Sequence, residues 1–440
     1  MTLALASRRT ALTPPWVRND LWRRARAVPS LDLRFADNKS LTDAVTGASL
    51  VTFTRASNGT YTDSAGVLQT ATNDVPRFDH NPTTGESLGL LVEEQRTNSI
   101  RNNTMVGAVA GTPGTNPTLW QYVTAQSNGL TQSVVGTGTE NGINYIDYRF
   151  NGTTVASPLS IVFGIDGTTA ATAQTWTGSL YWKLAAGTAI GVSTWQIGII
   201  EQTAGGSFVE GANYTQTAPT SAALITQRPA ATRTLSGGGT VGRVQIALSI
   251  NVTGNTAIDF TIRIGLPQLE QGAFATSVIP TTTAAVTRSA DVASITGSTF
   301  TSFYNQTEGS FFCSTFAPKG TIVYGTGDTF DNTQYINAAL SYNVIIRSGG
   351  AGSATLTAPV STATVANIAH GYAANNFAAV SNGGTIDTDT SGAVPLAQVR
   401  LKLGSSAWDT GGNNNINGHI RRLTFWGQRL PNNILQGITQ

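Results

Sequence analysis

A chain of 440 residues is long for a single hydrophobic core and favours two or three domains. Only 11% of its residues are charged and 47 are glycine. This composition excludes a protein built from exposed helices, because exposed helix faces are usually filled with Glu and Lys. The formal net charge is +2, but residues 1–40 carry eight basic and three acidic side chains, so a basic arm precedes a slightly acidic body.

The sequence also limits how the protein is stabilised and where it resides. Its one cysteine, Cys313, excludes an internal disulfide and a Cys-based zinc site, and we expect it to be a small buried core residue. The N-terminal run MTLALASRR lacks a sustained apolar core, and no apolar run approaches membrane-spanning length. We therefore expect neither a classical export signal nor a membrane-embedded protein.

Residues 1–40 are predicted to form an anchor arm. Thr13-Pro14-Pro15 can start a short helix that reaches Ala25, since proline is tolerated in a first helical turn. Arginine forms forked bonds to carboxylates of a partner, and tryptophan supplies buried anchor area. The expected docking residues are Arg8, Arg9, Trp16, Arg18, Trp22, Arg23, Arg24 and Arg26. Nucleic acid is the competing partner, but the tryptophans favour a protein socket, and deletion of residues 1–30 is expected to leave the rest folded.

Short strands follow the arm. Leu31, Leu33 and Phe35 alternate with other residues, and residues 41–101 are predicted to form a linking β module. A β-sandwich is predicted over residues 102–278. Its strand at 176–184 carries tryptophans in register with aliphatic residues, which favours core packing over a sugar-stacking platform.

Residues 244–264 show the clearest alternation. Apolar residues recur at every second position from Val244 to Val252 and again from Ile258 to Ile264, on either side of a glycine turn. This pattern predicts a β-hairpin with one buried face. Residues 279–292 lose the alternation and are predicted to be a seam before a second sandwich at 293–440. The predicted fold class is all-β, with two antiparallel β-sandwich (jelly-roll) domains in series after a short N-terminal anchor arm.

Three stretches carry a family resemblance. They are TFTRASNGTYTDSAG at 52–66, LLVEEQRTN at 90–98 and QLEQGAFATSVIPTTTAAVTRSADV at 268–292. In this order they resemble a module common in phage virion proteins, in which they accompany a sandwich similar to a carbohydrate-binding module. The resemblance covers residues 31–292 approximately and implies a virion origin.

The C-terminal part carries a second resemblance. GHIRRLTFWGQRLPNNILQGIT at 418–439 resembles the last strand and terminal helix of concanavalin A-like and laminin G-like jelly rolls. YNQTEGSFFCSTFAP at 304–318 resembles an early strand of the same domain. The resemblance implies a lectin-like sandwich of two antiparallel sheets, whose rim loops usually bind sugars.

The loop before this last strand is the predicted sugar site. It places an aromatic ring, a carboxylate and several amides beside flexible glycines, which is how a protein grips a sugar. The expected ligands are Trp408, Asp409, Asn413, Asn414 and Asn415. The alternative is that Trp408 plugs the end of the sandwich.

No constellation of residues predicts catalysis, and we expect that the protein is not an enzyme. Glucanases with concanavalin-like folds resemble each other by a Glu-x-Asp-x-x-Glu strand that this chain lacks. No cofactor is expected, with calcium as the one alternative. Asp387, Asp389 and Ser391 match the start of a calcium loop, but the twelfth position is Gln398 in place of the bidentate Glu.

Taken together, the sequence predicts a virion surface fibre or spike protein that attaches to host surface polysaccharide by non-covalent sugar binding. Its arm would contact other virion proteins, and it would form a homo-oligomer, a trimer or, at a capsid vertex, a pentamer. The alternatives are a structural decoration or connector protein without sugar binding and, more distantly, a polysaccharide depolymerase. The sequence does not separate a head fibre from a tail fibre.

Overall fold

The computed structural model describes residues 20–122, 129–155, 158–317, 322–338, 341–361, 364–408 and 415–440. The chain divides into two compact units. One is Phe53–Val292, called here the inserted unit, and the other, called the terminal unit, combines the chain up to Thr52 with Ala293–Gln440. None of the helices in the described part of the chain has the length and apolar character that crossing a membrane requires.

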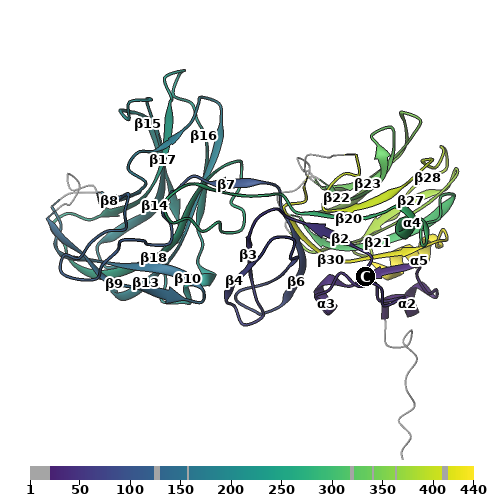
Figure 1. Ribbon diagram of the computed structural model, residues 1–440, viewed down its shortest axis with the longest axis horizontal. Helices are drawn as coiled ribbons and strands as arrows, with labels where there is room; N and C mark the ends of the chain where they lie inside the picture. Colours follow the sequence, from purple (N-terminus) through teal and green to yellow (C-terminus); the bar gives the residue numbers. More distant parts are fainter. Residues whose placement is uncertain are drawn as a thin grey trace, which may run out of the picture. The chain divides into compact units, whose positions relative to one another are not determined.

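Two antiparallel sheets form the sandwich of the inserted unit (Figure 1). One has the strand order β16-β13-β18-β10-β9, and the other has β15-β14-β17-β11-β8 with β12 beside β17. Their strands are β8 (Trp120–Tyr122), β9 (Leu130–Glu140), β10 (Ile143–Thr153), β11 (Leu159–Phe163), β12 (Thr168–Thr169), β13 (Thr175–Thr188), β14 (Val192–Gln202), β15 (Phe208–Gln216), β16 (Ala230–Thr234), β17 (Arg243–Val252) and β18 (Ala257–Gln271), with a 3₁₀ turn, η2, at Leu224–Thr226.

Aromatic residues fill the space between these sheets, which confirms the prediction of core packing. The rings of Trp182 on β13 and Trp195 on β14 lie 5.9 Å apart between centroids, and Phe260 on β18 lies 5.6 Å from Trp195. All three side chains are buried. Because β14 belongs to one sheet and β13 and β18 to the other, these contacts cross the core.

The predicted hairpin at 244–264 is wrong. Both strands exist, as β17 and β18, but β17 pairs with β14 and β11, whereas β18 pairs with β10 and β13. The chain therefore crosses from one sheet to the other at Thr253-Gly254-Asn255. Alternation places the apolar side chains of each strand toward the core, and it does so equally whether two strands pair side by side or face one another across a sandwich.

Shorter strands complete the inserted unit: β3 (Gly59–Thr62), β4 (Leu68–Ala71), β5 (Arg77–His80), β6 (Ser87–Val92), β7 (Arg96–Asn98) and β19 (Val286–Arg288). The prediction separated a linking module at 41–101 and a seam at 279–292 from the sandwich at 102–278. The structure instead places 53–101 and the seam in the same compact unit as that sandwich, and β7 pairs with β19. The two segments bond to each other, and this long-range pairing has no local sequence signal.

The terminal unit is the second sandwich. One of its sheets contains β28-β27-β26-β21-β30 with β1 beside β30, and the other contains β20-β29-β22-β23-β24-β25. Its strands are β1 (Leu31–Leu33), β20 (Val292–Thr296), β21 (Glu308–Phe316), β22 (Ile322–Thr329), β23 (Asn332–Asn337), β24 (Ser341–Ser348), β25 (Ala351–Ser361), β26 (Ala366–Ala373), β27 (Phe377–Ser381), β28 (Asp387–Asp389), β29 (Arg400–Leu403) and β30 (Gly418–Trp426), while β2 (Thr52–Thr54) lies at the boundary of the units. The helices are α2 (Asp20–Ala25), α3 (Phe35–Asn38), α4 (Gly297–Thr301) and α5 (Asn432–Ile438).

Contacts between the two sheets of the terminal unit involve several aromatic residues. Phe311 on β21 lies 5.1 Å from Tyr324 on β22 between ring centroids, and the Tyr324 hydroxyl lies 2.5 Å from Nε2 of His370 on β26. Cys313 is buried, as predicted. The strands and short helix expected at 304–318 and 418–439 are present as β21, β30 and α5, and the all-β fold class with antiparallel sandwiches is confirmed.

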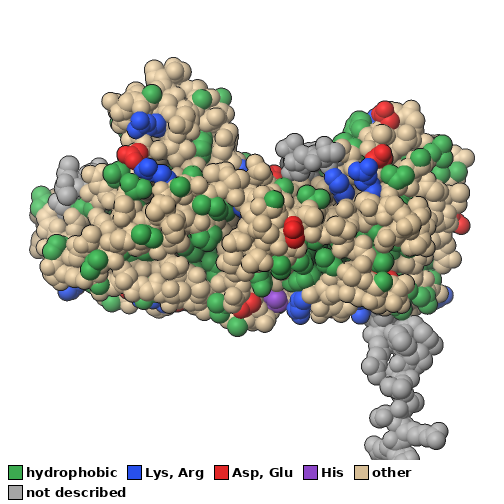
Figure 2. All heavy atoms as spheres, in the orientation of Figure 1, with side chains coloured by type: hydrophobic (Ala, Val, Ile, Leu, Met, Phe, Trp, Pro, Cys, Tyr) green, Lys and Arg blue, Asp and Glu red, His purple; other side chains and the backbone are tan. Residues whose placement is uncertain are grey.

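The N-terminal segment belongs to this sandwich. Leu31 and Leu33 of β1 pair with Phe425 and Leu423 of β30, and Phe35 begins α3 instead of extending the strand. The predicted arm at 1–40 therefore ends too late, because its described part from residue 20 packs against the C-terminal strand and helix (Figure 1). Figure 2 shows charged side chains only sparsely scattered over the displayed face, in keeping with the low charged fraction.

Candidate functional site

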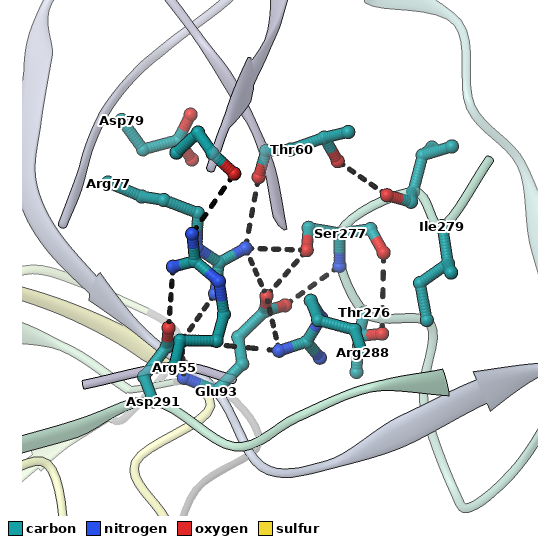
Figure 3. A network of polar contacts seen from close by, with 12 residues as sticks. Arg55, Thr60, Arg77, Asp79, Glu93, Thr276, Ser277, Ile279, Arg288 and Asp291 are labelled. Carbon is teal, nitrogen blue, oxygen red and sulfur yellow. Dashed lines mark hydrogen bonds and ion pairs between the residues drawn. The ribbon is translucent and has the colours of Figure 1, made fainter. Parts of the chain in front are cut away.

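Three buried arginines and two buried carboxylates form an ionic network in the inserted unit (Figure 3). They are Arg55, Arg77, Arg288, Glu93 and Asp291, which come from stretches far apart in the sequence. We call this set the arginine–carboxylate network. Buried charges are costly unless they are paired and hydrogen-bonded, so each contact of the network matters.

Asp291 joins two of the arginines. Its Oδ1 lies 3.1 Å from Nη1 of Arg55, and its Oδ2 accepts a bond from Nη2 of Arg77. The same Oδ2 accepts the backbone N–H of Glu93 at 2.8 Å. Both side-chain oxygens of Asp291 therefore have donors, as a buried carboxylate needs.

Glu93 holds the other side of the network. Its Oε2 lies 2.8 Å from Nη1 of Arg77 and 3.4 Å from Nη1 of Arg288. Ser277 donates twice to this carboxylate, from its backbone N–H to Oε1 at 2.7 Å and from its hydroxyl to Oε2 at 2.6 Å. Arg288 also donates to the backbone oxygen of Glu94 at 2.9 Å.

Gly59 makes room for two of the guanidinium side chains. A Cβ at this position would lie 3.0 Å from Nε of Arg55 and 3.2 Å from Cδ of Arg77. Any larger residue would have to displace side chains that are themselves buried and bonded. Gly59, the first residue of β3, is therefore a packing requirement of the network.

The surroundings decide the protonation of Glu93. Burial alone would raise the pKa of Glu93, but Arg288, Arg77 and the two bonds from Ser277 outweigh it and hold that pKa far below its ordinary value. Burial likewise opposes the charge on Arg77, while Asp291 and Glu93 raise its pKa above the ordinary value. Glu93 therefore stays ionised at neutral pH and does not act as a proton donor there.

The network explains what the three resembling stretches do physically. Arg55 lies in the first stretch, Glu93 in the second, and Ser277, Arg288 and Asp291 in the third. Their side chains bond to one another in the folded chain. These bonds connect the N-terminal and C-terminal ends of the inserted unit. The structure gives these residues a structural role, and sequence reasoning did not connect them.

The predicted sugar residue Trp408 lies in an aromatic cluster of the terminal unit. Its ring meets Tyr335 at 5.0 Å and Phe330 at 5.3 Å between centroids, in both cases edge to face. The guanidinium of Arg347 lies 4.0 Å from the centre of the Phe330 ring. We call Phe330, Tyr335, Arg347 and Trp408 the aromatic cluster.

The cluster is partly open to solvent. Phe330 is 46% exposed and Trp408 is half-buried, whereas Tyr335 is buried. Burial raises the pKa of Tyr335, with Arg347 opposing, so this residue stays a neutral phenol. The half-buried Trp408 ring combines packing on Tyr335 with an accessible surface, which leaves both predicted roles open.

Local backbone packing positions the Trp408 segment. At Gly325 on β22, a Cβ would lie 3.1 Å from the backbone nitrogen of Ala407. Glycine therefore lets the chain before Trp408 lie directly on this strand. This contact could not be predicted from local sequence patterns, because the two positions are far apart along the chain.

Of the remaining predicted sugar residues, the structure describes only Asn415. Asn415 is buried, and neither polar atom of its side chain has a hydrogen-bond partner in the described part of the chain. Its burial makes it unsuitable as a surface ligand in this conformation. Asp409, Asn413 and Asn414 lie outside the described residues.

The predicted docking residues are also divided. Arg8, Arg9, Trp16 and Arg18 lie outside the described residues, whereas Arg23 and Arg26 are exposed. Trp22 does not serve as an exposed anchor, because it packs within the terminal unit against α5 and donates from Nε1 to Asp32 at 2.9 Å. Arg24 likewise donates to the backbone oxygens of Gly437 and Gln440.

Of the three residues predicted to bind calcium, Asp387 and Asp389 accept hydrogen bonds from the protein, and Ser391 donates to Asp389. Asp387 on β28 accepts the backbone N–H of Thr357 at 2.8 Å, and Asp389 accepts both the N–H and the hydroxyl of Ser391 at 2.8 Å. Gln398 is buried and accepts a bond from Thr326. Within the described ranges, no three His, Cys, Asp or Glu side chains gather into a metal-binding group.

Comparison with known proteins adds distant likenesses only. No protein-family model and no curated protein sequence matches the chain. Among solved structures, it is similar to the CBM40 of Ruminococcus gnavus IT-sialidase, with 16% identity over 30% of this chain and 83% of that one and a TM-score of 0.27. Mouse laminin alpha1 domains LG4-5 give 9% identity, 66% and 90% coverage and a TM-score of 0.22.

A third similar structure is the NanB sialidase from Streptococcus pneumoniae, with 15% identity over 32% of this chain and 25% of that chain and a TM-score of 0.27. All three likenesses are too distant to support an argument about function. The assignment of antiparallel β-sandwiches rests on the strand pairing described above.

Proposed function

We propose that this protein is a virion surface fibre or spike protein of a phage, or of a phage-like gene transfer particle, and binds host surface polysaccharide without covalent chemistry. The observation that carries the sugar-binding part is the aromatic cluster around Trp408, where an exposed Phe330 and a half-buried tryptophan lie together on a sandwich. Sugar rings present apolar CH faces that pack on such rings. The virion part rests on the three resembling stretches of the sequence.

Weak single sites suit this function. Many copies on one particle raise the effective concentration of each site, so avidity grows without new contacts. We therefore also propose a homo-oligomer, with three copies as the first expectation and five at a capsid vertex. The exposed Arg23 and Arg26 remain candidates for contacts with other virion proteins.

Trp408→Ala tests the sugar-binding proposal. We expect at least a roughly tenfold loss of affinity for host surface polysaccharide, because stacking area is removed from an accessible ring. The affinity is measured with immobilised polysaccharide, and the melting temperature is measured in parallel. Phe208→Ala is the matched control, since Phe208 is 71% exposed in the other unit and its loss is expected to change neither quantity.

Unchanged binding and melting temperature in Trp408→Ala would place the site elsewhere. A second candidate function is a structural decoration or connector protein, which the arginine–carboxylate network favours, because the resembling stretches serve there to hold the fold. The absence of binding to any glycan on an array, together with normal particle assembly, would support that role. We rank a polysaccharide depolymerase third, since Glu93 of the adjacent acidic pair is committed to the network.

A further inference from the structure

A cavity of about 430 Å³ lies within the inserted unit, next to the arginine–carboxylate network. Its lining comes from two parts of the chain: the β3–β4 hairpin with the residues that flank it, and residues 278–287, which reach β19. Most of these residues belong to the first and third of the three resembling stretches. The size of the cavity is within the range of pockets that hold small ligands.

The network fixes the hairpin side of the cavity. Arg55 donates from Nε to the backbone oxygen of Ser57 at 2.8 Å, and Arg77 donates from Nη1 to the backbone oxygen of Thr60 at 3.0 Å. These two bonds lie on either side of Asn58 in the sequence, and Asn58 lines the cavity. The buried network therefore holds the backbone that presents this asparagine.

Hydrogen bonds also fix the opposite side. The Thr60 hydroxyl donates to the backbone oxygen of Val278 at 2.5 Å and so connects the two sides (Figure 3). The backbone of Ile279 donates to Oε1 of Gln268 at 2.8 Å and accepts from Nδ2 of Asn98 at 2.9 Å. All of these residues are buried, so the cavity is formed before any ligand arrives.

A ligand in the cavity can reach both polar and apolar side chains. On the hairpin side, Asn58, Thr70 and Asn73 line the cavity and are exposed. On the other side, Pro280 is exposed and Val286 is 40% exposed. No charged side chain and no aromatic ring lines the cavity among the described residues.

This lining restricts the class of ligand. A carboxylate or phosphate would need a cation within reach, but the side chains of Arg55 and Arg77 are completely buried. A plain hexose would find no ring on which to stack. An acetamido group fits better, because its amide both donates and accepts, as a carboxamide partner requires, while its methyl suits an apolar wall.

We propose that this cavity binds the acetamido group of a neutral N-acetylated sugar. The carboxamides of Asn58 and Asn73 would bond to the sugar, and Pro280 and Val286 would cover its methyl group. The inference rests on the proposed function for its class of ligand, but it assigns a second site, in the other unit. The recognised polysaccharide would then contain N-acetylhexosamine, and one chain would contact it at two places.

The test uses the full chain carrying Trp408→Ala, so that stacking on this ring does not contribute. N-acetylglucosamine and N-acetylgalactosamine are the probes, and glucose and galactose are the matched sugars without an acetamido group. Saturation-transfer NMR measures affinity and identifies the ligand protons that touch the protein. We expect at least one N-acetylhexosamine to bind roughly tenfold more tightly than its parent hexose, with the strongest saturation on the acetamido methyl.

N-acetylneuraminate separates the acetamido group from charge, since it carries this group together with a carboxylate. It is expected to bind more weakly than the N-acetylhexosamines, because no cation in the described lining compensates the carboxylate.

A double variant tests the two asparagines. Adding Asn58→Ala and Asn73→Ala is expected to weaken N-acetylhexosamine binding roughly tenfold, through the lost hydrogen bonds. Both side chains are exposed, so the melting temperature should change little. Asn213→Ala is the matched control, since Asn213 is an exposed asparagine of β15 outside the lining, and it should change neither quantity.

Four results would overturn the inference: no N-acetylhexosamine binds, the parent hexose binds equally well, N-acetylneuraminate binds more tightly, or the double variant binds normally. Any of them, together with normal polysaccharide binding by the wild-type chain, would remove this site and leave the proposed function standing. Binding of an N-acetylhexosamine by a protein whose wild-type chain binds no host polysaccharide would support this site and contradict the proposed function.

Discussion

Asp291 lies near the C-terminal end of the inserted unit, yet it bonds to Arg55 near the other end. Removing one partner of a buried ion pair leaves an uncompensated charge, which costs far more than the pair itself contributes. The two guanidinium groups that Asp291 holds have no exposure through which water could replace it. Single residues in this network are therefore expected to govern the stability of the whole unit.

We predict that Asp291→Asn lowers the unfolding free energy of the inserted unit by about 3–5 kcal/mol, because Arg55 and Arg77 then face a neutral amide. Urea denaturation measures the change. Asp259→Asn is the matched control, since its pair with Arg149 is about half exposed, at 51% and 47%, and is expected to contribute little. Equal effects of the two substitutions would show that the buried network does not stabilise the inserted unit more than an exposed ion pair does.

At this scale the sequence revealed little of the network. Arg55, Glu93 and Asp291 all lie in stretches that the sequence marks as a family resemblance, but local spacing cannot pair residues about 200 positions apart. Trp408 was predicted as a sugar ligand because a tryptophan beside a glycine-rich, amide-rich loop is a local signal, whereas its contacts with Phe330 and Tyr335 were not predictable.

Helix α2 is the element whose observed role differs most from the role predicted from the sequence. Its apolar residues Leu21, Trp22 and Ala25 pack with α5 on the outer face of the sheet that contains β21 and β30. Trp22 does need a partner surface, as the sequence indicates, but that surface is supplied by the same chain. An amphipathic pattern shows that one face of a helix is covered, but it does not identify the surface that covers it.

Trp22→Ala is predicted to destabilise the terminal unit by about 3–5 kcal/mol, because it removes a buried ring and leaves Asp32 without one of its donors. Thermal unfolding checks this prediction, with Val28→Ala as the control at a 61% exposed position beside it. A variant of normal stability that no longer associates with particles would return Trp22 to the docking role predicted from the sequence.

Strand prediction succeeded where the alternation was strong and failed at the pairing. β17 and β18 are both where the sequence places them, but they lie in opposite sheets. Strands β21 and β30 were placed from resemblance and pair with each other, Phe311 lying opposite Phe425. Periodicity therefore identified strands and buried faces, whereas sheet membership depended on contacts that alternation does not encode.

At the scale of the whole molecule, the two units should respond differently to acid. Burial lowers the pKa of His370 in the terminal unit to about 3, with Arg429 acting in the same direction. The unfolded chain takes up this proton below pH ~6.5 and the folded chain does not, so the terminal unit loses stability as pH falls below that value. Glu93, whose folded pKa is depressed, stabilises the inserted unit above pH ~4.3, and this stabilisation is lost only at lower pH.

Hydrogen exchange of peptides from each unit should therefore show the terminal unit opening first between pH 6.5 and 4.5 (about the interval between the ordinary His and Glu pKa values). His370→Gln is expected to flatten this dependence, since a neutral amide takes up no proton. Glu93→Gln should leave the dependence of the terminal unit unchanged. Identical acid sensitivity of the two units would contradict the assignment.

The chain order has a consequence for synthesis on the ribosome. Asp32 bonds to Arg422, 390 residues later, so the first strand of the terminal unit waits for its partner while nearly the whole chain is made. At ~5–20 residues per second this wait lasts roughly 20–80 s. During that time the apolar side chains of Leu31, Leu33 and Trp22 lack the C-terminal residues on which they pack. All residues of the inserted unit, Phe53–Val292, are synthesised before those C-terminal residues. The nascent chain therefore exposes an apolar N-terminal segment while the inserted unit folds. A chaperone that binds apolar segments is expected to bind this one.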